Sequence, residues 1–234
     1  MLSLPALCHN REKGSKKMSI PQAILWDMDG TLLNTLEDLR DSVNASLADC
    51  GFSPRSLEEI RSFVGNGVTK LLERSLPPEA DSKQLARVHE LFRDYYEQNC
   101  QNKTQPYPGI VELLRQLKQR GVAMAVVSNK PEAATQRLNR YYFGQLIPVA
   151  VGAQPGLNRK PAPDMPLLAL KLLNAQPQHS LLIGDSETDI ACARNTGLRC
   201  ISVTWGFRER EFLLSQGADC VINSPAELAR LWGL

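Results

Sequence analysis

The chain of 234 residues is 43% hydrophobic, 22% charged and 6% aromatic, with 15 glycines and 15 prolines. These fractions are ordinary for a globular protein and exclude collagen-like, low-complexity and wholly disordered chains. No apolar run approaches the roughly 20 residues that a membrane-spanning helix needs, so we expect no membrane partner.

The formal net charge of +2 is unevenly distributed along the chain. Residues 1–19 carry four basic residues and one acidic residue, whereas the other 215 residues carry 23 basic and 24 acidic residues. We interpret residues 1–19 as a flexible basic leader, because this segment lacks the long apolar stretch of a secretory signal. A nucleic-acid-binding protein usually has a basic face on its folded part, so we expect no nucleic-acid partner.

The six cysteines and three histidines are scattered, without a CxxC pair or a spacing typical of a zinc site. Such cysteines are typical of a reducing compartment, and we therefore predict a cytoplasmic protein. The sequence does not specify the oligomeric state, for which we expect a monomer or a weak homodimer.

The predicted elements begin with a strand and a long helical segment. The continuous apolar run over residues 23–26 is typical of a strand that is buried on both faces. Helical periodicity follows over residues 36–50, 57–63, 68–75 and 82–99, with no strand-like run between them. This segment is too long for a simple crossover connection. We predict a helical cap domain over residues 36–105, inserted into a core domain of residues 20–35 and 106–234.

Strands and helices alternate in the rest of the chain. Apolar runs predict strands over residues 122–127, 147–151, 181–183, 200–203 and 220–222, and helical patterns cover 110–120, 131–141, 164–174 and 188–196. This alternation predicts an α/β fold with right-handed βαβ units and a Rossmann-like, mostly parallel sheet. Ligands of such sheets bind beyond the carboxyl ends of the strands, so polar residues at those ends are candidate site residues.

The first motif, Asp27-Met28-Asp29-Gly30-Thr31, directly follows the first predicted strand. Its two carboxylates can converge on one hard cation and one reacting group, with the glycine allowing a sharp turn. One carboxylate can attack phosphorus, and the other can transfer a proton to the leaving oxygen. A strand-end turn with solvated aspartates explains the motif alone less well, but remains open.

Three weaker motifs follow in the chain. The hydroxyl of Ser128, in Ser128-Asn129-Lys130, can bind a phosphate oxygen or cap the next helix. Lys160, before Pro161, can neutralise an anionic phosphate or be a surface lysine. Asp185 and Asp189, four residues apart, can hold a divalent cation, or can cap a helix and place favourable negative charge at its N-terminus.

In this order, the four motifs resemble those of the haloacid dehalogenase superfamily, and in particular its phosphatases with a helical cap inserted after the first motif. The resemblance covers roughly residues 22–234 and matches the family pattern at Asp27, Asp29, Thr31, Ser128, Lys160, Asp185 and Asp189. It implies a Mg²⁺-dependent phosphomonoester hydrolase that acts through an aspartyl-phosphate.

The resemblance also implies a role for each matched residue. Asp27 is expected to be the nucleophile and a metal ligand, and Asp29 the general acid and base, with its backbone carbonyl on the metal. The candidates for binding phosphate are Thr31, Ser128, Asn129 and Lys160, and those for binding metal are Asp185 and Asp189. The second acid, Asp29, argues against the dehalogenases and phosphonate-cleaving members of the superfamily.

The cap segment carries a more local resemblance. Residues 64–74, 107–110 and 128–130 are similar to segments of phosphoglycolate phosphatases, which implies a small phosphorylated substrate. The candidate specificity residues in the cap are Gly65, Asn66, Gly67 and Lys70. Asn34 departs from the pattern, since many relatives carry aspartate there. A sugar-phosphate phosphatase, a phosphomutase, a pyrophosphatase or an inactive relative that binds a partner through its cap remain alternatives.

Overall fold

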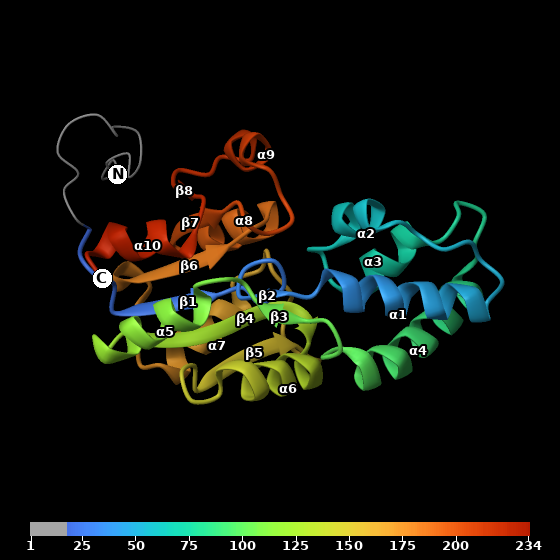
Figure 1. Ribbon diagram of the computed structural model, residues 1–234, viewed down its shortest axis with the longest axis horizontal. Coiled ribbons are helices and arrows are strands. Elements are labelled where there is room, and N and C mark those ends of the chain that lie inside the picture. The colour runs from blue at the N-terminus through green and yellow to red at the C-terminus, as the bar shows by residue number, and fades with distance from the viewer. Residues whose placement is uncertain (1–17) are drawn as a thin grey trace.

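Six strands of the computed structural model form one parallel sheet (Figure 1). They are β1 (Ala23–Trp26), β4 (Ala123–Pro131), β5 (Val149–Ala153), β6 (Ser180–Gly184), β7 (Arg199–Val203) and β8 (Val221–Ile222). The spatial order is β5-β4-β1-β6-β7-β8. Trp26 of β1 lies opposite Val126 of β4 and Ile183 of β6, so the first strand occupies the middle of the sheet. The structure describes residues 18–234, and most of the predicted leader lies outside the described residues.

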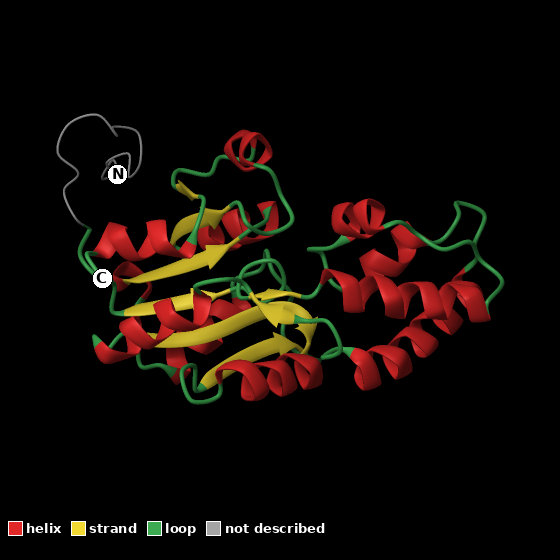
Figure 2. Cartoon of the chain, in the orientation of Figure 1, coloured by secondary structure: helices red, strands yellow, loops and turns green. Residues whose placement is uncertain are grey.

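Helices cover both faces of this sheet (Figure 2). On the face that bears Ile24 and Trp26 pack α5 (Ile110–Gln119), α6 (Glu132–Phe143) and α10 (Pro225–Trp232). On the face that bears Leu25 pack α7 (Asp164–Leu172) and α8 (Glu187–Thr196). Successive side chains of a strand point to opposite faces, so a sheet covered on both sides needs continuous apolar runs. The predicted α/β fold with its mostly parallel sheet is confirmed.

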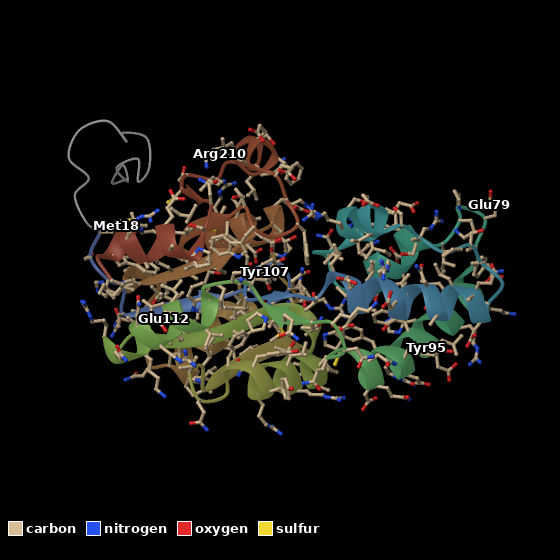
Figure 3. All side chains as sticks on the ribbon, in the orientation of Figure 1. Met18, Glu79, Tyr95, Tyr107, Glu112 and Arg210 are labelled. Carbon is tan, nitrogen blue, oxygen red and sulfur yellow. The ribbon has the colours of Figure 1, made fainter. Side chains whose placement is uncertain are left out.

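Four helices form a separate group at one end of the molecule, which we call the helical block (Figure 1). They are α1 (Leu36–Asp49), α2 (Leu57–Phe63), α3 (Val68–Ser75) and α4 (Ser82–Asn99). α1 packs against α2 and α4, and α3 contacts α2 and α4. Glu79, in the turn before α4, lies at the end of the block that is far from the sheet (Figure 3).

The chain enters and leaves the helical block through two paired segments. β2 (Leu33–Asn34) pairs antiparallel with β3 (Gln105–Pro106). Buried Asp38, in the first turn of α1, accepts hydrogen bonds from the backbone N–H groups of Lys103 and Thr104. Tyr107, which follows β3, lies over the sheet-bearing part of the molecule (Figure 3), and its backbone N–H donates to the carbonyl of Leu32. The chain therefore enters and leaves the helical block through two segments that lie side by side.

Several short elements differ from the sequence-based predictions. The strand predicted over residues 147–151 lies over Val149–Ala153, because Ile147 is buried in the core before the strand begins. The short strands β2 and β3 and the helices α9 (Arg210–Ser215) and α10 were not predicted, nor was the 3₁₀ turn Pro177–His179. Elements this short contain too few periods to give a clear pattern. Within residues 18–234, no helix has the length and apolar character to cross a membrane.

Candidate active site

The predicted acids and the Ser128 motif meet where β1, β4 and β6 end. Asp27 and Asp29 follow β1, Ser128 lies near the end of β4, and Asp185 follows β6. They border a cavity of about 40 Å³ between the sheet and the helical block. Its walls are Asp27, Asp29, Ser128, Asn129, Lys130, Asp185, Ser186, Phe207 and Arg208 from the sheet-bearing part, and Leu39, Val64, Gly65, Gly67, Val68 and Leu71 from the block.

Asp27 is held against a buried lysine. Its backbone N–H donates to the carbonyl of Ile183, which continues the hydrogen bonding of β1 to β6. The Nζ of Lys160 lies 2.9 Å from Asp27 Oδ1 and 2.7 Å from Asp189 Oδ1, with 2% of the lysine side chain exposed. Burial and the charge of Asp189 raise the pKa of Asp27 to about 7, against the lowering effect of Lys160. Burial lowers the pKa of Lys160, but the charges of Asp189 and Asp27 outweigh this effect and raise it.

Three carboxylates form a cluster that fits a divalent cation. Asp27, Asp185 and Asp189 each offer one oxygen within 4.8 Å of the others. Burial, followed by the charges of the other two acids, raises the pKa of Asp185 well above its ordinary value. Oxygen donors in this number and arrangement suit Mg²⁺, and its charge would offset the repulsion between the carboxylates.

Asp189 is already engaged by protein groups. Its Oδ1 binds Lys160, and its Oδ2 accepts hydrogen bonds from the hydroxyl and backbone N–H of Ser186. Ser186 is the N-cap of α8, and with Asp189 it forms a reciprocal capping box. The capping explanation of this motif is therefore observed, and the same carboxylate also contacts Lys160, while cation binding stays a prediction.

Three glycines leave room for the carboxylates of Asp185 and Asp189 beside the backbone. A Cβ at Gly30, whose φ is +83°, would lie 2.3 Å from an oxygen of Asp185. One at Gly206 would lie 2.4 Å from the same oxygen, and one at Gly184 would lie 2.2 Å from the carboxyl carbon of Asp189. Gly206 was not predicted as a site residue, because its contact with Asp185 depends on the fold of a loop after β7.

The phosphate-binding candidates do not all lie on the cavity wall. Ser128 and Asn129 line it, and the Asn129 amide donates to the carbonyls of Gly65 and Lys160. Thr31 is fully buried, and its hydroxyl donates to Asp185 at 3.3 Å. Thr31 is therefore positioned to orient a candidate metal ligand rather than to face a bound phosphate.

Lys130 belongs to the Ser128-Asn129-Lys130 motif but was not predicted as a site residue. Its Nζ lies 2.9 Å from both carboxylate oxygens of Asp29. The lysine side chain is 2% exposed and that of Asp29 is 15% exposed. Its position after Ser128 was a signal in the sequence, but the sequence did not show that its amine would meet Asp29.

The four candidates in the cap segment have different surroundings. Gly65 and Gly67 line the cavity with φ angles of +124° and +87°. The amide of Asn66 donates to the hydroxyl of Thr188, across the gap between the helical block and α8. Lys70 does not line the cavity, because its side chain is 58% exposed and pairs with Glu73.

A third unpredicted residue, Arg208, joins the two parts of the molecule. Its guanidinium donates to Glu187 and to the backbone carbonyls of Arg61 and Val64. Arg61 in turn donates to the carbonyl of Gly206. The carbonyls of Arg61 and Val64 lie at the C-terminal end of α2, where a helix favours positive charge. Arg208 is thus positioned to hold the helical block over the cavity.

Comparison with known proteins agrees with this geometry. The family model described as haloacid dehalogenase-like hydrolase matches residues 24–203. The chain belongs to this family. It is 36% identical to a phosphoglycolate phosphatase of Nitrosospira multiformis, over 90% of this chain and 95% of the relative. It is 31% identical to a phosphoglycolate phosphatase of Aquifex aeolicus, over 90% of this chain and 96% of the relative.

Solved structures give the same assignment. A protein of Lactobacillus delbrueckii subsp. bulgaricus, provisionally assigned as a phosphoglycolate phosphatase, superposes with a TM-score of 0.85 at 36% identity, over 90% of this chain and 98% of that one. CbbY of Rhodobacter sphaeroides, bound to xylulose-(1,5)bisphosphate, superposes with a TM-score of 0.72 at 26% identity, over 89% and 96%. The resemblance to phosphatases of the haloacid dehalogenase superfamily is confirmed.

Proposed function

We propose that this family member is a Mg²⁺-dependent phosphomonoester hydrolase that forms an aspartyl-phosphate on Asp27. The observation that carries the proposal is the placement of Asp27 and Asp29 on one cavity, each beside a buried lysine. A nucleophilic carboxylate and a second carboxylate for proton transfer are what hydrolysis through an acyl phosphate requires.

The cluster of acids supports the proposed metal. Asp27, Asp185 and the backbone carbonyl of Asp29 would hold Mg²⁺, and Asp189 would support the site through Lys160. When bound, the cation supplies the positive charge that lets two anions, the nucleophile and the phosphoester, approach each other.

The chain's own residues would carry the bond changes. An oxygen of Asp27 attacks phosphorus, the ester P–O bond breaks, and Asp29 gives a proton to the leaving oxygen. Water then attacks the phosphorus of the aspartyl-phosphate, Asp29 takes the proton of that water, and phosphate leaves with Asp27 restored. Ser128 and Asn129 would hold the phosphoryl oxygens, and Lys160 would lower the pKa of Asp27 against the effect of burial and offset the negative charge.

The substrate that we propose is phosphoglycolate or a similarly small phosphoester. The cavity of about 40 Å³ favours a compact ligand, and several relatives carry this activity in their names. The second candidate is a sugar phosphate, which is favoured by the likeness to CbbY and its bound sugar bisphosphate. A sugar phosphate would require a wider opening of the helical block than the structure has.

We also propose that residues 36–105 act as a lid domain over a core of residues 20–35 and 106–234. Its paired entry and exit strands and its polar contacts through Arg208 and Asn129 support this division. A lid excludes water while the phosphoester reacts, and admits the attacking water later. We retain a cytoplasmic location, a monomer or weak homodimer, and no nucleic-acid or membrane partner as proposals from the sequence.

Release of inorganic phosphate from a panel of small phosphoesters tests the proposed function. The panel contains phosphoglycolate, sugar phosphates, pyrophosphate and p-nitrophenyl phosphate, each with Mg²⁺ and with excess chelator. We expect phosphoglycolate to have the highest kcat/KM and chelator to abolish turnover. A sugar phosphate in first place would leave the chemistry intact and replace the substrate. A folded protein that hydrolyses none of these esters would contradict the proposal and favour an inactive, partner-binding relative.

A further inference from the structure

Lys130 lies at the contact between the proposed acid-base residue and the helical block. Its Nζ binds both oxygens of Asp29 and also lies 4.6 Å from the centre of the Tyr96 ring. Asp29 belongs to the loop after β1, Lys130 to the end of β4, and Tyr96 to α4. One ammonium group, carried by β4, therefore contacts two other segments that are distant in the sequence.

The lysine is buried at a cost that stability alone does not explain. With 2% of its side chain exposed, Lys130 has lost almost all of its hydration. A buried ion pair often gives no more stability than apolar side chains of the same volume. The Lys130 ammonium, however, lies 2.9 Å from both oxygens of Asp29, so it restrains where that carboxylate can lie. The pair is therefore better explained by the placement of Asp29 than by the stability of the fold.

The aromatic side of this contact is also fixed in orientation. The Tyr96 ring stacks on Phe92, one turn earlier in α4, with centroids 5.3 Å apart and an interplanar angle of 8°. Both side chains are buried, at 4% and 2% exposure. A cation over a ring face is attracted by the ring electrons, more strongly where water is excluded. A movement of α4 away from the sheet would remove this contact from Lys130.

We propose that Lys130 is a positioning residue that fixes the carboxylate of Asp29, and that the Tyr96 ring places Lys130 correctly only when the helical block is closed. The inference rests on the proposed function, in which Asp29 transfers protons. It adds a device by which closure of the block and correct placement of the acid-base group occur together. Substrate would then react only in the closed molecule, where water is excluded.

The alternative role for Lys130 is direct binding of a substrate carboxylate. Both roles predict a loss of activity on substitution, but they differ in the kinetic constant that changes. A residue that positions Asp29 affects kcat for every phosphoester, because all of them form the same aspartyl-phosphate, whose hydrolysis needs Asp29 to take a proton from water. A residue that binds a substrate carboxylate raises KM for phosphoglycolate and leaves p-nitrophenyl phosphate, which has no carboxylate, unaffected.

The first experiment compares the wild-type protein with Lys130→Met, which keeps most of the side-chain length and removes the charge. We expect kcat to fall about a hundredfold for both esters, since a reacting group misplaced by about 1 Å can cost that much. We expect KM to change less than threefold. Unchanged kcat for both esters, or a loss confined to KM of phosphoglycolate, would overturn the proposal.

The second experiment tests the aromatic contact and does not depend on the folding of Lys130→Met. Tyr96→Leu removes the ring face, Tyr96→Phe keeps it, and Tyr95→Leu is the control on the same helix, where the hydroxyl binds Asp49 near the surface. We expect kcat to fall about tenfold for Tyr96→Leu, clearly less for Tyr96→Phe, and not at all for Tyr95→Leu. Equal kcat for Tyr96→Leu and Tyr96→Phe would contradict the role of the ring.

Crystal structures separate a failure of this inference from a failure of the proposed function. We expect the Asp29 carboxylate to lie against Lys130 in the wild-type protein and to leave that position in Lys130→Met or, if that variant does not fold, in Tyr96→Leu. This measurement has meaning even if the wild-type protein hydrolyses no ester. An Asp29 carboxylate that keeps the same position in the variant would overturn the inference.

Discussion

The ion pairs at the carboxyl ends of the strands, which we call the sheet edge, differ in burial from the ion pairs in the helical block. At the sheet edge, Lys130 and Lys160 are almost fully buried and pair with the acids of the site. In the helical block, the pairs Lys70–Glu73 and Arg87–Glu90 are each more than one third exposed. Exposed pairs contribute little to stability, whereas buried charges are costly and are kept where they act on other charges. In this comparison the buried ion pairs involve candidate site residues, whereas the exposed pairs lie away from the cavity.

The two regions contact each other through both apolar and polar groups. One apolar cluster runs through the sheet-bearing part and the helical block, and single polar groups also join the two across the cavity. The Asn129 amide reaches Gly65, Asn66 reaches Thr188, and Arg208 reaches the end of α2. Polar contacts of this kind can be exchanged for water at little cost, which is compatible with the lid that we propose.

The largest effect should come from the sheet edge itself. We expect Asp27→Asn to lower kcat for phosphoester hydrolysis by at least about a thousandfold, because an amide cannot replace the attacking carboxylate. The fold should be retained, since Asn has nearly the same volume and removes charge from a crowded cluster. Activity and circular dichroism, measured on one preparation, check both points. A folded variant with wild-type turnover would remove Asp27 from the role of nucleophile.

A smaller loss is expected from the contact between the regions. Arg208→Gln removes hydrogen bonds to the carbonyls at the end of α2 and to Glu187. We expect kcat/KM to fall roughly tenfold, because the helical block would be closed for a smaller fraction of the time. Arg87→Gln, which loses an exposed ion pair within the block, is the matched control and should retain wild-type kcat/KM. Equal kinetics for the two variants would show that Arg208 does not hold the block.

The buried charges also predict how stability depends on pH. The pKa of Asp27 is about 7 in the folded protein against 3.8 for the free group, so the folded state keeps a proton that the unfolded state has lost. Stability of the metal-free protein should therefore fall as pH rises from about 4 to 7. Between pH 5 and 7.5 we expect the wild-type protein to lose on the order of 2 kcal/mol more than Asp27→Asn.

Urea denaturation in chelator, with both proteins at both pH values, measures this difference. Saturating Mg²⁺ should reduce it, because the cation stabilises the ionised carboxylate. Parallel pH profiles for the two proteins in chelator would show that Asp27 is ionised throughout this range.

The smallest effect is expected at the surface of the helical block. Lys70 pairs with Glu73 and faces solvent rather than the cavity. We expect Lys70→Ala to change kcat/KM for phosphoglycolate less than twofold and stability by less than about 0.5 kcal/mol. A large rise in KM for phosphoglycolate would instead return Lys70 to the set of specificity residues.

Much of the fold could be predicted from the sequence because its signals are local. The apolar runs that became β1, β4 and β6 are bounded by polar or turn residues, and the helices of the block have clear periodicity. The late elements α9 and α10 could not be predicted from periodicity at this length, although Ser224-Pro225 at the start of α10 is a typical helix start. Ile147 misled the prediction of β5, since a residue can be buried in the core without belonging to a strand.

The residues of the candidate site also divide into those that local signals in the sequence predict and those that they do not. Asp27, Asp29, Ser128 and Asp185 stand at strand ends, and a parallel sheet brings its strand ends to one edge, so their order along the chain was enough to bring them together. Thr31 belongs to the same motif as Asp27 and Asp29, but its hydroxyl donates to Asp185 instead of facing the cavity. The direction of a side chain within a tight turn depends on the residues that pack around it. The spacing of residues in a motif does not specify those neighbours.

The sequence by itself determined the fold class, the chemistry of the acids and the membership of a hydrolase family, because these depend on residue types at fixed positions along the strands. The tertiary structure alone decided which charges are buried and what they face. Lys130 meets Asp29 and the Tyr96 ring, Arg208 meets the end of α2, and Lys70 turns to solvent. The reason is physical: these contacts join segments tens of residues apart, and their geometry exists only after the sheet and the helical block have packed together.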